Sequence, residues 1–411
     1  MSRVNVNFIM PFLLFFPMIS RWILPSGIES LLIVEYKFYS LYLPDLTLLI
    51  YLYLQRRFGS INKDLFNLSF EKKFKLIAFL LIGYAFIIGV ANNNSEIILP
   101  ITSCFSWLYL TIIFVFFPLS KEQIEISKYI MIPTLLFLCV EILLYSLGII
   151  QYTSSSGKEL EAQEYADIYR ISTTIGAATG SALIIMILGI VCTTRYKIPK
   201  WLKFTIYIIT SVSILFTISR GAILTWTLYL ILAFAIYFFS NGFTLKKYLF
   251  LFFLAGLLIE FNHLGVFEPL VQRTAQLSYD NQVESGRDVL RKKTMNIISE
   301  SYYMGVGLGQ VFPDKDVLNR IHSSHKTAPH NSYLIIFAEL GFVGLVLFLF
   351  MLIMMSLYLD YSKAAFWAWV FLLLVNFNTE GVLLHSEFWS AVLFFYLNLE
   401  KKYENTLYLH A

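Results

Sequence analysis

The feature that most constrains this chain is a series of long apolar runs, many of them close to twenty residues, separated by short polar connections. A helix of about 20 apolar residues crosses a bilayer core, where its backbone groups bond to one another. The composition agrees, because 58% of the 411 residues are hydrophobic and 14% are charged, against about 25% charged in a soluble domain. The sequence therefore excludes a soluble enzyme, a disordered chain and a disulfide scaffold. It predicts an all-α polytopic membrane protein.

We expect about twelve transmembrane helices, which would use roughly 240 residues. Their predicted ranges are 6–24, 38–54, 75–91, 96–117, 129–150, 171–193, 202–218, 221–239, 247–263, 331–358, 364–379 and 384–399. Two of these runs meet at Ser219-Arg220-Gly221. Because an arginine in mid-bilayer is costly, this sequence predicts a tight turn between two spans. The first run lacks a small-residue cleavage site, so we expect it to be retained as a helix.

The distribution of lysine and arginine indicates the orientation, because cytoplasmic loops carry an excess of both. With both termini in the cytoplasm, the inner segments collect 18 basic residues and the short outer segments collect 5. The other 8 lie in one long segment, to which the rule does not apply. This predicts transmembrane helices one to nine over residues 1–262, a large outer loop over 263–329, and helices ten to twelve over 330–411. The net charge of +4 gives no indication of nucleic-acid binding.

Two arginines are candidates for binding an anion at the outer face. Arg220 lies in the predicted tight turn, and its planar guanidinium suits bidentate binding of phosphate oxygens. The alternative is an arginine that only marks the membrane interface. Arg287 begins a stretch of helical periodicity that continues to Ile298, and a helix N-terminus favours anions. The alternative for Arg287 is a solvated residue paired with a neighbouring carboxylate.

His330 is the candidate for proton transfer. It follows Pro329 at the end of the large outer loop and opens a new apolar span. Histidine titrates near neutral pH, and nearby arginines disfavour its protonated form. A neutral imidazole can accept a proton from a sugar hydroxyl. The alternative is a histidine that caps the helix without chemistry.

No metal or cofactor is predicted. The spacing of His322, His325 and His330 fits no closed zinc site, and no cysteine or acidic residue stands at ligand spacing. The glycines from Gly305 to Gly309 do not form a phosphate-binding loop, and we interpret them as a flexible turn. Of the acidic residues within spans only Glu141 is expected to lie deep, which disfavours a proton-driven transporter.

The sequence from His330 resembles a signature of the O-antigen ligase/O-antigen polymerase family of bacterial inner-membrane proteins. It reads His330-Asn331, nine residues, then Gly341-x-x-Gly344, after a large outer loop. Three further stretches are similar to parts of that family. They are Ser219-Arg220-Gly221, Ser285-Gly286-Arg287, and Tyr169-Arg170-Ile171-Ser172 with Ala177-Ala178-Thr179-Gly180 after it.

The resemblance implies a GT-C-like helical fold and metal-independent, inverting glycosyl transfer on the periplasmic face of the inner membrane. The donor would be a glycan on undecaprenyl diphosphate. The acceptor would be lipid A–core for a ligase, or a second lipid-linked repeat unit for a polymerase. By motif, His330 would activate the acceptor hydroxyl, and Arg220 and Arg287 would hold the diphosphate. Arg170 and Asn331 are additional candidates for the substrate site.

The residues at 170–180 resemble the ligases somewhat more than the polymerases, so we expect a ligase. The alternatives are an O-antigen polymerase and a protein-directed oligosaccharyltransferase of the same superfamily. From a different class, a flippase or transporter of lipid-linked oligosaccharides also fits twelve spans. Internal repeats and a charged pair at mid-membrane would favour a transporter, and the sequence has neither.

Overall fold

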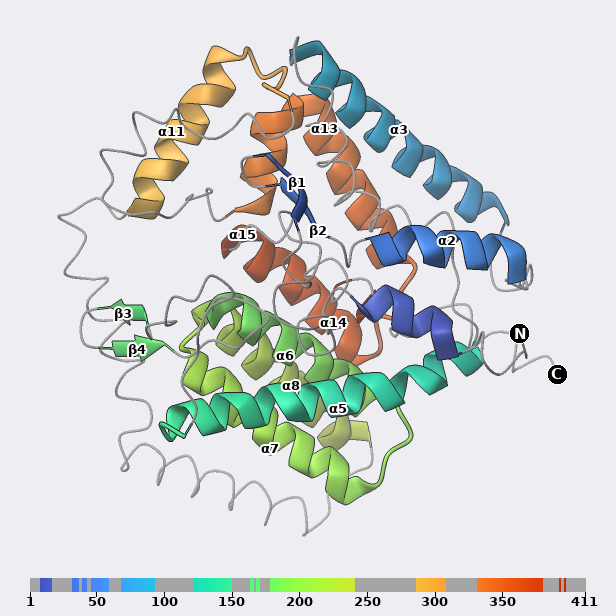
Figure 1. Cartoon of the computed structure of the whole chain (residues 1–411), viewed down its shortest axis with the longest axis vertical. Helices are drawn as coiled ribbons and strands as arrows, with labels where there is room; N and C mark the ends of the chain where they lie inside the picture. Colours follow the sequence, from blue (N-terminus) through green and yellow to red (C-terminus); the bar gives the residue numbers. More distant parts are fainter. Residues whose placement is uncertain are drawn as a thin grey trace.

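The computed structural model describes residues 8–16, 32–36, 39–42, 46–58, 68–92, 121–149, 163–165, 168–170, 178–240, 286–307, 331–379, 392 and 395–396. These residues are mostly helical, as predicted (Figure 1). The departure from an all-α fold is two short antiparallel hairpins. In one, β1 (Leu32–Tyr36) pairs with β2 (Tyr39–Tyr42), and in the other β3 (Gln163–Tyr165) pairs with β4 (Ile168–Arg170).

The helices are α2 (Thr47–Phe58), α3 (Leu68–Asn92), α5 (Lys121–Ser146), α6 (Ala178–Thr194), α7 (Lys200–Thr217), α8 (Arg220–Ser240), α11 (Gly286–Glu300), α13 (Ser332–Leu357), α14 (Ala364–Phe371) and α15 (Phe377–Thr379), with a π-helix, η4 (Leu372–Asn376), between the last two. Among the described residues, 4 helices are long and apolar enough to cross a membrane. These are α3, α5, α7 and α13, and α6, α8 and the run from α14 into η4 are shorter apolar helices.

These helices coincide with the predicted third, fifth to eighth, tenth and eleventh spans. The predicted spans 96–117 and 247–263, and most of 384–399, lie outside the described residues. The predicted span 38–54 is wrong at its start, where β2 occupies Tyr39–Tyr42 and the helix begins at Thr47. Tyrosine favours strands, and Pro44 disfavours a helical conformation in the residue before it.

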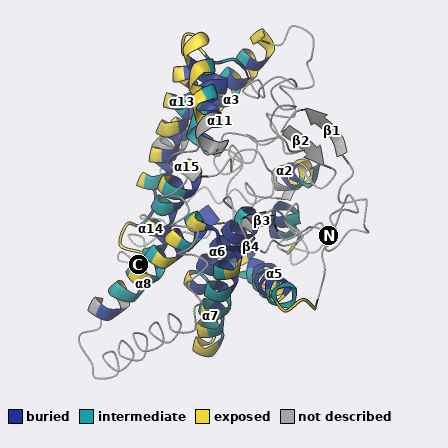
Figure 2. Cartoon of the chain, turned by 90° about the vertical axis from the view of Figure 1, so that its left-hand side faces the viewer, coloured by how far each residue is buried: buried dark blue, intermediate teal, exposed yellow. Residues whose placement is uncertain are grey.

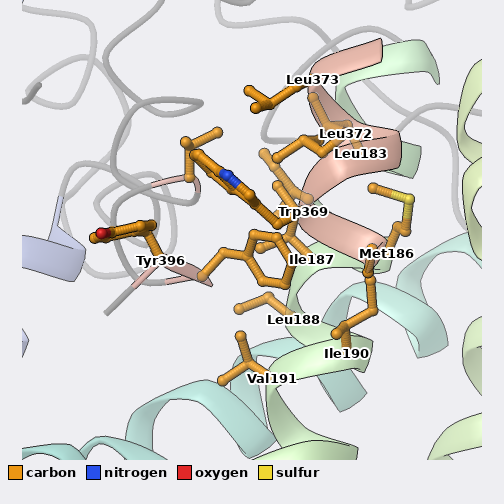
Figure 3. Packing of buried hydrophobic residues seen from close by; sticks show 14 of the residues in the cluster. Leu183, Met186, Ile187, Leu188, Ile190, Val191, Trp369, Leu372, Leu373 and Tyr396 are labelled. Carbon is orange, nitrogen blue, oxygen red and sulfur yellow. The ribbon is translucent and has the colours of Figure 1, made fainter. Parts of the chain in front are cut away.

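Helix α6 forms the centre of the core. It contacts α5, α7 and α8. All of its apolar side chains between Ala182 and Val191 are buried. A helix that is apolar all round belongs in an interior. Figure 3 shows Leu183, Ile187 and Val191 of this helix packed near Trp369 of α14 and Tyr396.

The second part of α13 has an exposed apolar stripe that suits contact with lipid. The stripe includes Phe342, Val346, Leu349, Phe350 and Ile353, which recur at helical spacing and are all exposed. Figure 2 shows exposed residues along the outer side of α13. Exposed apolar side chains in such a continuous row are typical of a surface that water does not cover, which agrees with a membrane-spanning segment.

Candidate active site at one end of the helix bundle

The predicted tight turn at Arg220 is confirmed. Helix α7 ends at Thr217, and α8 begins at Arg220 after two connecting residues. The Ser219 carbonyl accepts the backbone N–H of Ile223, which begins the bonding of α8, and the Ser219 N–H donates to the Thr217 hydroxyl at 3.3 Å. Ile218 has a φ of 50°, a left-handed conformation that costs a β-branched residue about 1 kcal/mol or more. The turn therefore fixes Arg220, whose side chain is exposed, as the first residue of α8.

Asn331 is the N-cap of α13. Its side-chain oxygen accepts the backbone N–H of Leu334 at 2.9 Å. This is the usual capping contact, which satisfies one of the free N–H groups of the first helical turn. His330, the residue immediately before this cap, lies outside the described residues.

Two hydrogen bonds connect the segment from η4 to α15 with both α8 and α13. The buried Asn376 side-chain NH2 donates to the Thr225 hydroxyl of α8 at 2.9 Å. The side-chain NH2 of Asn331 donates to the Asn378 side-chain oxygen at 3.3 Å. Thr225 is five residues after Arg220, about 7.5 Å along the helix axis. This segment therefore bridges the helix that begins with Arg220 and the helix that follows His330.

The directions of these helices bring Arg220 and Asn331 to the same end of the bundle. Helix α14 precedes Asn376 and packs along α8. Only five residues of α8 precede Thr225, the partner of Asn376, and these are too few for α14 to pack along in a parallel direction. The two helices therefore run antiparallel. Residues after Asn376 then lie toward the first turn of α8, so Asn378 and its partner Asn331 lie on the Arg220 side of Thr225.

The predicted helix at Arg287 is confirmed, and Arg287 lies in the first turn of α11. Leu290, Thr294 and Ile298 form its buried face, as their spacing predicts. Ile298 packs against Ala338 of α13. Figure 1 shows α11 beside the first part of α13, with the N-terminal ends of both helices toward the same side. The Arg287 side chain lies outside the described side chains.

The first glycine of the His330 signature, Gly341, has a structural role that the sequence analysis missed. Gly341 interrupts α13 with a φ of 65° and a ψ of −168°, a conformation that is essentially restricted to glycine. At this break, residues 303–307 bond to the opened helix. The N–H of Val306 donates to the Ala338 carbonyl at 2.9 Å, the N–H of Gly307 to that of Glu339 at 2.9 Å, and Phe342 donates to the Tyr303 carbonyl at 2.8 Å.

The backbones at this junction are in direct contact. A Cβ atom on Gly341 would collide with the backbone of Met304, and one on Gly305 would lie 2.5 Å from the backbone nitrogen of Gly341. Gly305 and Gly307, with φ of 89° and 96°, were predicted to form a flexible turn. The end of this predicted turn, Gly309, lies outside the described residues, and the described part is not a separate turn but is hydrogen-bonded to α13 through Val306 and Gly307. It anchors the end of α11 to α13.

The remaining sequence candidates contribute less to the described geometry. Arg170 ends β4, where its Cα pairs with that of Gln163, and its side chain lies outside the described side chains. His322 and His325 also lie outside the described residues. Two cysteines among the described residues, Cys139 and Cys192, are free and buried.

The structure adds Thr225, Asn376 and Asn378 to the candidate site. Sequence reasoning missed them because it searched charged residues and motifs. A signal was present, since the eleventh predicted span places two asparagines, Asn376 and Asn378, within an otherwise apolar run. Amide side chains in a membrane segment need hydrogen-bonding partners, and their spacing near the end of the span indicated a polar contact there.

A comparison with family models places these elements in a known group. Residues 204–349 match the model described as O-antigen ligase. The matched segment includes Arg220, Arg287, His330 and both glycines of the signature. Residues 204–349 therefore carry the domain of the O-antigen ligase/polymerase family. A search of curated proteins found no match.

The match to the O-antigen ligase/polymerase family agrees with the apolar helices of this chain, since the family is membrane-associated. Its members are glycosyltransferase-like enzymes that use lipid-linked glycans. The resemblance expected from the sequence is therefore confirmed at the level of the family. The family covers both ligases and polymerases, so the match does not distinguish between these two activities.

Proposed function

We propose that this protein is an O-antigen ligase that transfers a polysaccharide from undecaprenyl diphosphate to a sugar hydroxyl of lipid A–core. The observation that supports this most is the bridge from Thr225 through Asn376 and Asn378 to Asn331. It brings the Arg220 end of α8 and the residue after His330 to the same side of the bundle. The proposed anion-binding residue, and the residue that follows the proposed base in the chain, therefore belong to elements far apart in the sequence.

In the proposed reaction, the acceptor hydroxyl oxygen attacks the anomeric carbon of the donor glycan. His330 takes the hydroxyl proton and becomes an imidazolium. The bond between the anomeric carbon and the diphosphate oxygen breaks on the opposite face, so the configuration inverts. The bonding electrons leave with undecaprenyl diphosphate, whose added negative charge Arg220 and Arg287 stabilise. This account requires no metal ion, because the guanidinium groups neutralise the leaving group.

We propose that the site faces the periplasm and that both termini are cytoplasmic. Because α6, α7 and α8 are consecutive helices, the α6–α7 connection and the α7–α8 turn lie at opposite ends of α7. Arg195, Lys197 and Lys200 cluster at the first end, and the second end has Arg220. The excess of basic residues marks the cytoplasmic side. The Arg220 end is then periplasmic, in the bacterial inner membrane.

Substituting Arg220 by lysine tests the binding of the diphosphate. Lysine keeps the positive charge but lacks the planar fork that binds two oxygens at once. We expect Arg220→Lys to reduce glycan transfer at least tenfold and to raise the KM for the lipid-linked donor. Arg291→Lys is a matched control on the exposed face of α11 and should retain full activity. Full activity of Arg220→Lys would show that Arg220 does not clamp the diphosphate.

Deletion of the gene distinguishes the ligase from the polymerase. A ligase deletion removes all long chains from lipopolysaccharide gels, while lipid-linked polymer accumulates. A polymerase deletion leaves the core with a single repeat unit. Unchanged lipopolysaccharide would contradict both activities and favour a transporter or a different glycan.

A further inference from the structure

The first turn of α13 is attached to the segment that follows α14 at two points. The Tyr333 hydroxyl donates to the Leu373 carbonyl at 2.9 Å, and the Asn331 side chain donates to Asn378. The Tyr333 ring also packs against Phe377, with ring centroids 5.9 Å apart. The helix end that follows His330 is therefore fixed against this segment by polar and aromatic contacts.

The π-helical geometry of η4 makes part of this attachment possible. In a regular α-helix the N–H of Phe377 would bond to the Leu373 carbonyl, four residues earlier. Here the N–H of Phe377 donates to the Leu372 carbonyl instead. The Leu373 carbonyl accepts the Tyr333 hydroxyl. Such π-helical turns are rare in proteins, and those that occur are often found at functional sites.

The amides of Asn331 and Asn378 form a chain in which each uses both of its ends. The Asn378 NH2 donates to the Leu374 carbonyl at 2.7 Å, which turns its oxygen toward Asn331. The Asn331 NH2 donates to that oxygen, and its own oxygen caps α13 through the N–H of Leu334. Rotating either amide by 180° would bring two donors or two acceptors together. The chain therefore fixes the orientation of the cap.

We propose that Asn378 is a positioning residue of the active site. It acts through Asn331, holding the start of α13 at a set place relative to Arg220, and His330 is the residue that precedes Asn331 in the chain. Asn376 completes the connection through its buried hydrogen bond to Thr225 of α8. This inference rests on the proposed glycan transfer. It adds that the base and the diphosphate-binding residue are aligned through η4 and α15.

The test is a double-substitution cycle measured on purified, full-length protein in liposomes. The substrates are an undecaprenyl-diphosphate-linked glycan and lipid A–core, and the variants are Asn331→Ala, Asn378→Ala and the combination of both. We expect Asn378→Ala to lower kcat about 3- to 10-fold, the effect of a single hydrogen bond. The KM for the donor should not change, because the arginines remain. Asn296→Ala, an exposed asparagine on α11, is the matched control and should match the wild type.

The combined variant identifies the route of action. If Asn378 acts through Asn331, the double variant is no slower than Asn331→Ala alone, because the link is already broken. Multiplied effects in the double variant, or a change in KM alone, would overturn the proposal, as would full activity of Asn378→Ala. Thermal unfolding of each variant distinguishes a lower kcat of folded protein from a smaller amount of folded protein. If the wild type itself transfers no glycan, the proposed function fails, which is a different result.

Discussion

His330→Ala is expected to abolish glycan attachment while the protein still inserts into the membrane and folds. A positioned general base contributes about 10²–10⁴-fold to a rate, or roughly 3–5 kcal/mol. The alanine keeps the Asn331 cap, which satisfies the N–H of Leu334. The loss should therefore fall on kcat and leave the amount of membrane protein unchanged.

The two other histidines of the large outer loop provide matched controls for this substitution. His322→Ala and His325→Ala remove the same chemical group from nearby positions in the chain. Both should attach glycan at the wild-type level in cells that lack the native gene. Normal attachment by His330→Ala would contradict its role as the base. An equal loss in all three variants would indicate a general requirement of the loop instead.

Gly341→Ala is expected to have the largest effect on stability. The ψ of −168° at positive φ is a region that alanine avoids, at a cost of about 1–3 kcal/mol. The added Cβ would also collide with the backbone of Met304, which cannot rotate away as a side chain can. The three backbone hydrogen bonds between residues 303–307 and α13 depend on this contact. We expect the thermal unfolding temperature and the glycan transfer to fall together.

Gly83→Ala is the control for Gly341→Ala. Gly83 lies within α3, and a Cβ there would meet no heavy atom within 4 Å. Alanine has a higher helix propensity than glycine by about 1 kcal/mol, so this variant should be as stable as the wild type or more so. A Gly341→Ala protein that unfolds at the wild-type temperature would contradict the interpretation of the helix break as an obligatory glycine position.

The sequence was sufficient for the elements whose signals are local. The turn at Arg220 followed from the cost of a charge within the bilayer, and α11 followed from the spacing of Leu290, Thr294 and Ile298. Both predictions depend on residues within one or two turns of each other. The predicted start of the second span was wrong because a short apolar run does not by itself distinguish a strand such as β2 from a helix.

The contacts that assemble the site could not be predicted in this way. The bond between Asn376 and Thr225 joins residues 151 positions apart, and that between Asn331 and Asn378 joins residues 47 apart. Hydropathy identifies a span but not its rotation or its neighbours. The break at Gly341 also depends on residues 303–307, which reach it only in the folded chain. The family resemblance identified the motif that contains Gly341, but it did not give the physical reason why glycine is needed at that position.

The most direct test of the account is transfer by the purified protein in liposomes, supplied with the undecaprenyl-diphosphate-linked glycan and lipid A–core and without added metal. The account predicts glycan-bearing lipid A–core and an equal amount of released undecaprenyl diphosphate, with both products reduced at least tenfold in Arg220→Lys and lost in His330→Ala. Movement of an intact donor across the bilayer, with no new glycosidic bond and no released diphosphate, would contradict it.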